Sequence, residues 1–158
     1  MAVIGFVGAG NMGEALIRGL LARKVVRAAD LWVSEPDAAR RSRLVKEHRV
    51  RAAADNAELA HRCGVIVLAV KPQLLPAVLS GIAPAAGRGK LVVSIAAGVT
   101  LATLEQALAA RLVRTMPNTP ALVAEGATAI AWGRGVTAAD KNLVRKLFGA
   151  VGTTVEVA

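Results

Sequence analysis

Apolar positions along the chain fall into two alternating patterns, which predict strands followed by helices. Nearly uninterrupted apolar runs, as at 65–70 and 91–95, are typical of parallel strands covered on both faces. Residues 11–23 instead repeat an apolar residue every three to four positions, which is helical spacing. Strands are predicted at 3–7, 31–34, 50–52, 65–70, 91–95, 112–115, 127–131 and 154–157, and helices at 11–23, 36–48, 55–62, 74–82, 100–110 and 137–148. The alternation predicts an α/β fold with a doubly wound, mostly parallel sheet of the Rossmann type.

The composition suits a single folded domain. With 158 residues, 54% of them hydrophobic, the chain can bury a full core. Aromatic residues make up only 3%, so Ala, Val, Leu and Ile must fill that core. Cys63 is the only cysteine, which excludes an intrachain disulfide and favours a reducing, cytoplasmic location. No apolar run is long enough to span a bilayer, so no membrane association is expected.

The net charge of +9 raises the question of an anionic partner. Lysines and arginines are scattered, with one cluster at Arg40, Arg41, Arg43 and Lys46. No aromatic side chain interleaves with that cluster, although single-stranded nucleic acids are bound through aromatic stacking platforms. The pattern therefore favours a solvated helix face, and nucleic-acid binding is not expected.

The first motif with chemical meaning is Gly8-Ala9-Gly10-Asn11-Met12-Gly13. This G-x-G-x-x-G pattern is weak alone, but here it follows a predicted strand and opens a predicted helix. In such a loop the first glycine permits the turn, the second lets backbone approach a pyrophosphate, and the third packs the helix closely. Free N–H groups at the helix start then face the phosphates. We expect a dinucleotide to bind here.

The second motif is Ser34-Glu35-Pro36, at the end of the second strand. An acidic residue about 20 positions after the glycines usually accepts hydrogen bonds from the adenosine ribose. Glu35 lies near that position, and its charge would repel a 2′-phosphate, which favours NADH. Ser34 could instead donate to that phosphate, with Arg40 or Arg41 folding back onto it. The choice between NADPH and NADH stays open, with Glu35 alone favouring NADH.

Two further motifs follow the fourth and fifth strands, where open α/β sheets bind their ligands. In Ala69-Val70-Lys71-Pro72-Gln73, Pro72 keeps Lys71 out of helical geometry and extended at the rim of the sheet. In Ser94-Ile95-Ala96-Ala97-Gly98, small residues let a flat ring lie close to the backbone. A lone lysine is also typical of a solvated strand end, and small residues are also typical of core packing.

The last motif is Met116-Pro117-Asn118-Thr119-Pro120, followed by Glu125-Gly126. Two prolines three positions apart predict a rigid, extended loop that holds Asn118 and Thr119 near the same rim. We expect His48 and His61 to be surface residues. The spacing of His and Cys suggests no metal site.

Together these motifs resemble the pyrroline-5-carboxylate reductase family. The resemblance rests on Gly5-Phe6-Val7-Gly8-Ala9-Gly10-Asn11-Met12-Gly13-Glu14-Ala15, Asp55-Asn56, Val70-Lys71-Pro72-Gln73, Met116-Pro117-Asn118-Thr119-Pro120-Ala121 and Glu125-Gly126. It covers the whole chain. It implies reduction of 1-pyrroline-5-carboxylate to L-proline in proline biosynthesis, with NADPH or NADH as cofactor. Glu35 departs from the small or basic residue that is commoner in the family beside Ser34.

The resemblance also implies a set of cofactor contacts. They are Phe6, Val7, Gly8, Ala9, Gly10, Asn11, Met12, Gly13, Ser34, Glu35, Pro36, Asn56, Ala69, Val70, Lys71, Pro72 and Ala97, with Met116, Pro117, Asn118 and Thr119 as the substrate-side loop. Hydride transfer to the imine carbon depends mainly on positioning. A cationic Lys71 beside the imine nitrogen would oppose its protonation. Lys71, the one catalytic candidate, is therefore expected to hold cofactor or the substrate carboxylate.

The family continues into a C-terminal helical domain that forms the dimer and much of the substrate pocket. We therefore interpret 1–158 as the NAD(P)-binding domain alone, and expect a homo-oligomer only for a full-length member. Two alternatives stay open. One is a relative acting on another small acid, such as a β-hydroxyacid dehydrogenase, although the 116–120 loop argues against it. The other is a non-catalytic nucleotide-binding or assembly module.

Overall fold

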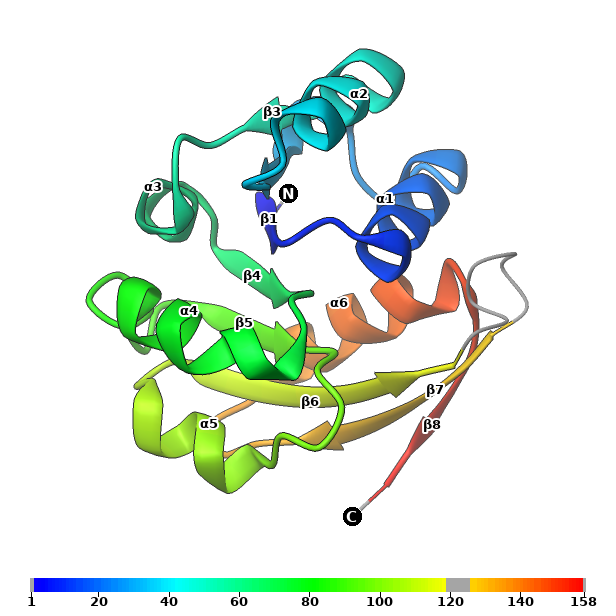
Figure 1. Cartoon of the computed structure of the whole chain (residues 1–158). Coiled ribbons are helices and arrows are strands. Elements are labelled where there is room, and N and C mark those ends of the chain that lie inside the picture. Colours follow the sequence, from blue (N-terminus) through cyan, green and yellow to red (C-terminus); the bar gives the residue numbers. More distant parts are fainter. Residues whose placement is uncertain (1, 119–125, 158) are drawn as a thin grey trace.

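A computed structural model describes residues 2–118 and 126–157, and Figure 1 shows strands and helices alternating along them. The strands are β1 (Ile4–Val7), β2 (Leu31–Ser34), β3 (Arg51–Ala52), β4 (Val65–Leu68), β5 (Leu91–Ser94), β6 (Arg111–Pro117), β7 (Gly126–Trp132) and β8 (Gly152–Glu156). The helices are α1 (Asn11–Ala22), α2 (Ala38–His48), α3 (Asn56–Arg62), α4 (Leu75–Ile82), α5 (Leu101–Ala107) and α6 (Ala138–Gly149), with 3-10 turns at Ala28–Asp30 and Pro72–Leu74. The predicted α/β class is confirmed.

One eight-stranded sheet in the order β3-β2-β1-β4-β5-β6-β7-β8 organises the described residues. Neighbouring strands are parallel except β6 and β7, which are antiparallel. The chain starts at β1, builds outward to β3, and returns to place β4 on the other side of β1. The strand order therefore reverses between β1 and β4, and ligands of doubly wound sheets bind at the carboxyl ends of strands beside such a switch point.

Helices cover both faces of the sheet, and each face has its own apolar core. On one face α1, α2 and α6 contribute Leu16, Leu44 and Phe148 to a cluster with the β1 side chains Ile4 and Phe6. On the other, a second cluster is built from helices α3, α4 and α5 through Leu59, Leu79 and Leu104, for example. As the apolar runs predicted, the four residues of β1, β4 and β5 are buried throughout.

Several predicted boundaries were wrong. The 116–120 loop was expected to begin at Met116, but β6 continues through Met116 and Pro117, because both pair with β7 opposite Ala129 and Thr128. Thr119 and Pro120 lie outside the described residues. Helix α5 ends at Ala107, three residues before its predicted end at 110, because the backbone becomes extended at Leu108 on its way to β6. No described helix has the length and apolar character needed to cross a membrane.

Candidate functional site

The glycine loop joins β1 to α1 and is closely packed at two of its three glycines. Gly8 has a φ of +81°, and a Cβ there would lie 2.9 Å from Cγ1 of Val70, which follows the neighbouring strand β4. A Cβ on Gly13 would meet the Gly8 carbonyl oxygen at 3.2 Å. These contacts give the first and third glycines the turn and packing roles that their spacing predicted.

Gly10 differs because the space beside it is open. A Cβ there would find only Arg40 Nη1 within 4 Å, at 3.7 Å. Gly10 is also the N-cap of α1 and supplies no side-chain acceptor to the first turn. The N–H groups at the start of a helix lack intrahelical partners and carry the positive end of its dipole, so an anion is favoured at this position. The loop thus presents both the space and the donors that a pyrophosphate needs.

Beside the loop lies a pocket of about 310 Å³ at the carboxyl ends of β1, β4, β5 and β6. Its lining residues are Gly10, Asn11, Met12, Ala69, Val70, Lys71, Pro72, Ile95, Ala96, Ala97 and Pro117. Four motifs that lie far apart in the sequence therefore meet in one place. Lys71 is exposed at the rim with extended backbone, φ −62° and ψ 145°, as expected for a residue before proline.

Other predicted site residues have structural partners of their own. Phe6 and Val7 are buried in the core, so their side chains are not available to a ligand. Ser34 is buried and donates from Oγ to Asn56 Oδ1 at 2.6 Å, which joins the end of β2 to the start of α3. Pro36 is exposed just before α2. Asn118 accepts the Ala127 N–H at 2.9 Å and thereby links β6 to β7.

Glu35 is buried against the glycine loop, with only 8% of the residue exposed. Its Oε1 accepts the Ala9 N–H at 3.1 Å, and its Oε2 accepts the Asp37 N–H at 3.0 Å. Arg41 donates from Nη1 to the Glu35 carbonyl oxygen at 2.9 Å. The residue therefore connects the glycine loop to the start of α2, an arrangement that the sequence did not reveal.

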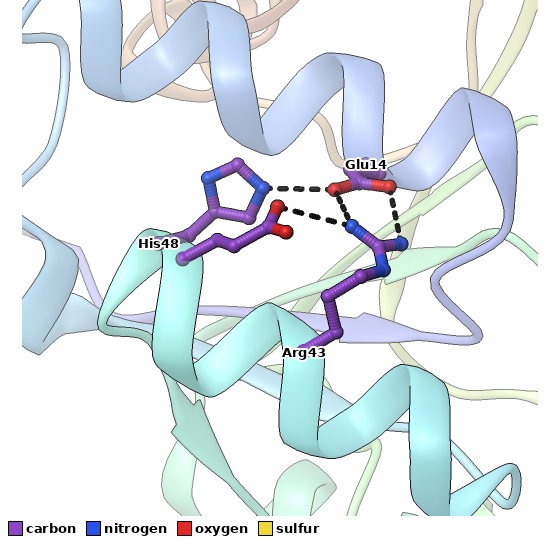
Figure 2. Close-up of polar contacts among 4 residues, drawn as sticks. Glu14, Arg43 and His48 are labelled. Atoms are coloured by element: carbon purple, nitrogen blue, oxygen red, sulfur yellow. Dashed lines mark hydrogen bonds and ion pairs between the residues drawn. The ribbon is translucent and has the colours of Figure 1, made fainter.

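A second polar cluster ties α1 to α2 (Figure 2). The Arg43 guanidinium donates to both oxygens of Glu14, at 2.7 and 2.8 Å, and His48 Nε2 lies 2.9 Å from Glu14 Oε2. Arg43 also donates to Glu47 at 3.2 Å. His48 was expected at the surface but its side chain is only 13% exposed, because it packs against Glu14 between the two helices.

The ligand atoms of Glu14, Glu47 and His48 lie within 4.8 Å of one another, which is compatible with a metal ion. Sequence spacing had suggested no such group, since Glu14 is 34 positions from His48. In this arrangement Arg43 already supplies the positive charge between the two carboxylates. The cluster is therefore self-contained as an ion-pair network that holds the first turn of α1 against α2.

This network predicts an acid-dependent contribution to stability. The hydrogen bond from Arg43 lowers the pKa of Glu14 from 4.5 to about 2. The folded chain then keeps Glu14 ionised where the unfolded chain would protonate it, so the stabilisation is complete above about pH 4.5 and is lost as the pH falls toward 2. In urea unfolding, the difference in midpoint between wild type and Glu14→Gln should shrink over that range.

The exposed Glu105→Gln on α5 is the matched control, since it removes a carboxylate outside the network. Its difference from wild type should stay constant with pH. A Glu14→Gln difference that also stays constant between pH 4.5 and 2 would show that the Arg43 contact does not hold Glu14 ionised.

Known proteins resemble this chain over most of its length. Residues 3–98 match the family model described as "NADP oxidoreductase coenzyme F420-dependent". A pyrroline-5-carboxylate reductase from Synechocystis is 42% identical over 155 residues, covering 98% of this chain and 58% of the relative. The chain thus spans little more than half the length of such curated relatives.

Two solved structures are similar over nearly the whole chain. A pyrroline-5-carboxylate reductase from Coxiella burnetii has a TM-score of 0.95 at 32% identity, with 99% of this chain and 59% of that chain covered. The Plasmodium falciparum pyrroline carboxylate reductase, a structure with NADP bound, has a TM-score of 0.88 at 32% identity, with 99% of this chain and 58% of that chain covered. The predicted resemblance is confirmed, and the chain belongs to the family that this model describes as "NADP oxidoreductase coenzyme F420-dependent".

Proposed function

We propose that this chain is the cofactor-binding part of a pyrroline-5-carboxylate reductase. The observation that carries the proposal is the pocket at the sheet's carboxyl edge, where the open side of Gly10 and the uncapped start of α1 adjoin the small residues Ala69, Ala96 and Ala97. These features fit a nicotinamide dinucleotide: donors for its pyrophosphate and a shallow surface for its ring. Bound NADPH or NADH supplies the hydride that converts 1-pyrroline-5-carboxylate to L-proline.

In this proposal the chain's own residues bind the cofactor and orient it. The backbone of the glycine loop and of the first turn of α1 holds the pyrophosphate, and residues 69–72 and Ala97 line the nicotinamide side. Ser34, Glu35, Pro36 and Asn56 form the adenosine end. Met116 to Thr119 would lie on the substrate side, of which Met116, Pro117 and Asn118 are described.

Lys71 is the charged residue in the pocket lining, and it is exposed. A cation beside the imine nitrogen would disfavour the protonated imine, which is the better hydride acceptor. Its role in the proposal is therefore to hold a phosphate or the substrate carboxylate, leaving proton donation to another group.

Titration calorimetry with NADPH and with NADH tests this function. Saturable binding of at least one cofactor, with one site per chain, is the expected result. A chain that is folded by circular dichroism and releases no heat with either cofactor would contradict it.

A further inference from the structure

The carboxylate of Glu35 is directed at the chain's own backbone. Both oxygens accept N–H groups, from Ala9 in the glycine loop and from Asp37 before α2. Hydrogen bonds from backbone N–H groups to a carboxylate are charge-assisted and strong, and Glu35 is almost fully buried. This arrangement assigns the carboxylate to holding the loop, although its sequence position had favoured a role as ribose acceptor.

Arg40, in the first turn of α2, reaches toward the same loop with a guanidinium that forms a long ion pair with Glu35. Its Nη1 is 3.9 Å from Glu35 Oε1, beyond hydrogen-bond range, and 3.7 Å from where a Gly10 Cβ would be. Within 2–118 and 126–157, nothing accepts a hydrogen bond from its guanidinium, and 43% of its side chain is exposed. The Arg40 guanidinium, whose N–H groups donate no hydrogen bond within the described residues, therefore lies between Gly10 and the end of β2.

The other charged groups near this point are already engaged. Arg41 donates to the Glu35 carbonyl oxygen. Asp37 caps α2 by accepting the Arg40 backbone N–H at 3.0 Å, and the N–H groups at the helix start lower the pKa of its carboxyl. Each carboxylate thus accepts hydrogen bonds from backbone donors, while the Arg40 guanidinium, ion-paired with Glu35 but without a hydrogen bond to it, keeps its N–H groups available to an added anion.

We propose that Arg40 is the specificity-determining residue for a 2′-phosphorylated adenosine, and so for NADPH, and that Glu35 is a positioning residue for the glycine loop. This inference rests on the proposed cofactor function. A guanidinium presents two parallel donors that match phosphate oxygens, and its charge offsets that of the buried Glu35. The chain is therefore expected to prefer NADPH, whereas the sequence position of Glu35 had favoured NADH.

The test compares dissociation constants for NADPH and NADH in the 158-residue chain. Arg40→Ala should weaken NADPH binding about tenfold while NADH changes less than about twofold, since one charge-assisted contact is lost. Arg40→Lys keeps the charge but loses the two parallel donors, so its dissociation constant for NADPH should lie between those of the wild type and Arg40→Ala. The matched control is Arg23→Ala at the far end of α1, an exposed arginine whose loss should change neither constant.

Glu35→Gln separates the two roles. It should weaken both cofactors by a similar factor, because it loosens the shared glycine loop, and leave their ratio unchanged. A Glu35→Gln chain that gains NADPH affinity relative to NADH, or an Arg40→Ala chain with an unmoved ratio, overturns this inference alone. An unsubstituted chain that binds neither cofactor overturns the proposed function together with it.

Discussion

Purified by itself, the 158-residue chain should bind a nicotinamide cofactor saturably and show no measurable reduction of 1-pyrroline-5-carboxylate. Catalysis requires the imine carbon to be held about 3–3.5 Å from the nicotinamide, and such alignment contributes roughly 7–11 kcal/mol to lowering the barrier. The pocket of about 310 Å³ is open at the sheet edge, and its lining contributes Lys71 as the charged group that could orient a substrate carboxylate. Water therefore reaches the site and substrate orientation is poorly fixed.

The measurement is oxidation of the reduced cofactor with and without substrate, at cofactor concentrations shown by calorimetry to saturate the chain. The full-length Synechocystis relative, assayed beside it, provides the positive control. A rate near that of the relative would show that residues 1–158 already complete the substrate site. Saturable binding without turnover would place substrate alignment outside these residues.

Gly10→Val should abolish cofactor binding while leaving the fold intact. The backbone at Gly10, φ −71° and ψ −162°, is extended and suits any residue, and the space beside it is open except for Arg40. The valine side chain would stand where the pyrophosphate must approach. Losing two charge-assisted contacts corresponds to a binding loss on the order of hundredfold or more. Calorimetry measures the loss, and a urea melt checks the fold.

Gly81→Val is the control, because Gly81 is exposed on α4 and a Cβ there meets nothing within 4 Å. It should bind cofactor as the wild type does. If Gly10→Val retained wild-type affinity with an unchanged unfolding midpoint, the pyrophosphate could not lie on this loop. Gly8 is unsuitable for the test, since its positive φ and the contact with Val70 would destabilise any variant.

The sequence predicted the order of elements because fully apolar runs such as 65–68 and 91–94 leave few alternatives to buried parallel strands. It also predicted that the glycine loop, Lys71 and Ala97 meet, since the carboxyl ends of parallel strands share one edge of a sheet. Pro117 was assigned to a loop because proline locally disfavours a strand. Pairing with β7, a contact distant in sequence, decided otherwise.

Side-chain direction was the part that the sequence could not supply. Glu35 has the position of a ribose acceptor, yet its Oε1 accepts the N–H of Ala9, 26 residues earlier in the chain. The contact between Arg43 and Glu14 spans 29 residues, whereas only the Arg43–Glu47 pair, four apart on one helix, has a recognisable spacing. Such contacts depend on how α1 and α2 pack, which no local pattern encodes.

The central place of β1 has a consequence for how the chain is made. Ile4 pairs with Leu31 on one side and with Val65 on the other, so β1 leaves the ribosome before both of the strands that it pairs with. Until residues 65–68 have emerged, the edge of β1 that faces β4 has no native partner. Non-local parallel pairing of this kind is slow and exposes nascent chains to aggregation. Protection of β1 by a chaperone is therefore most valuable until residues 65–68 have been synthesised and the β1–β4 pair can form.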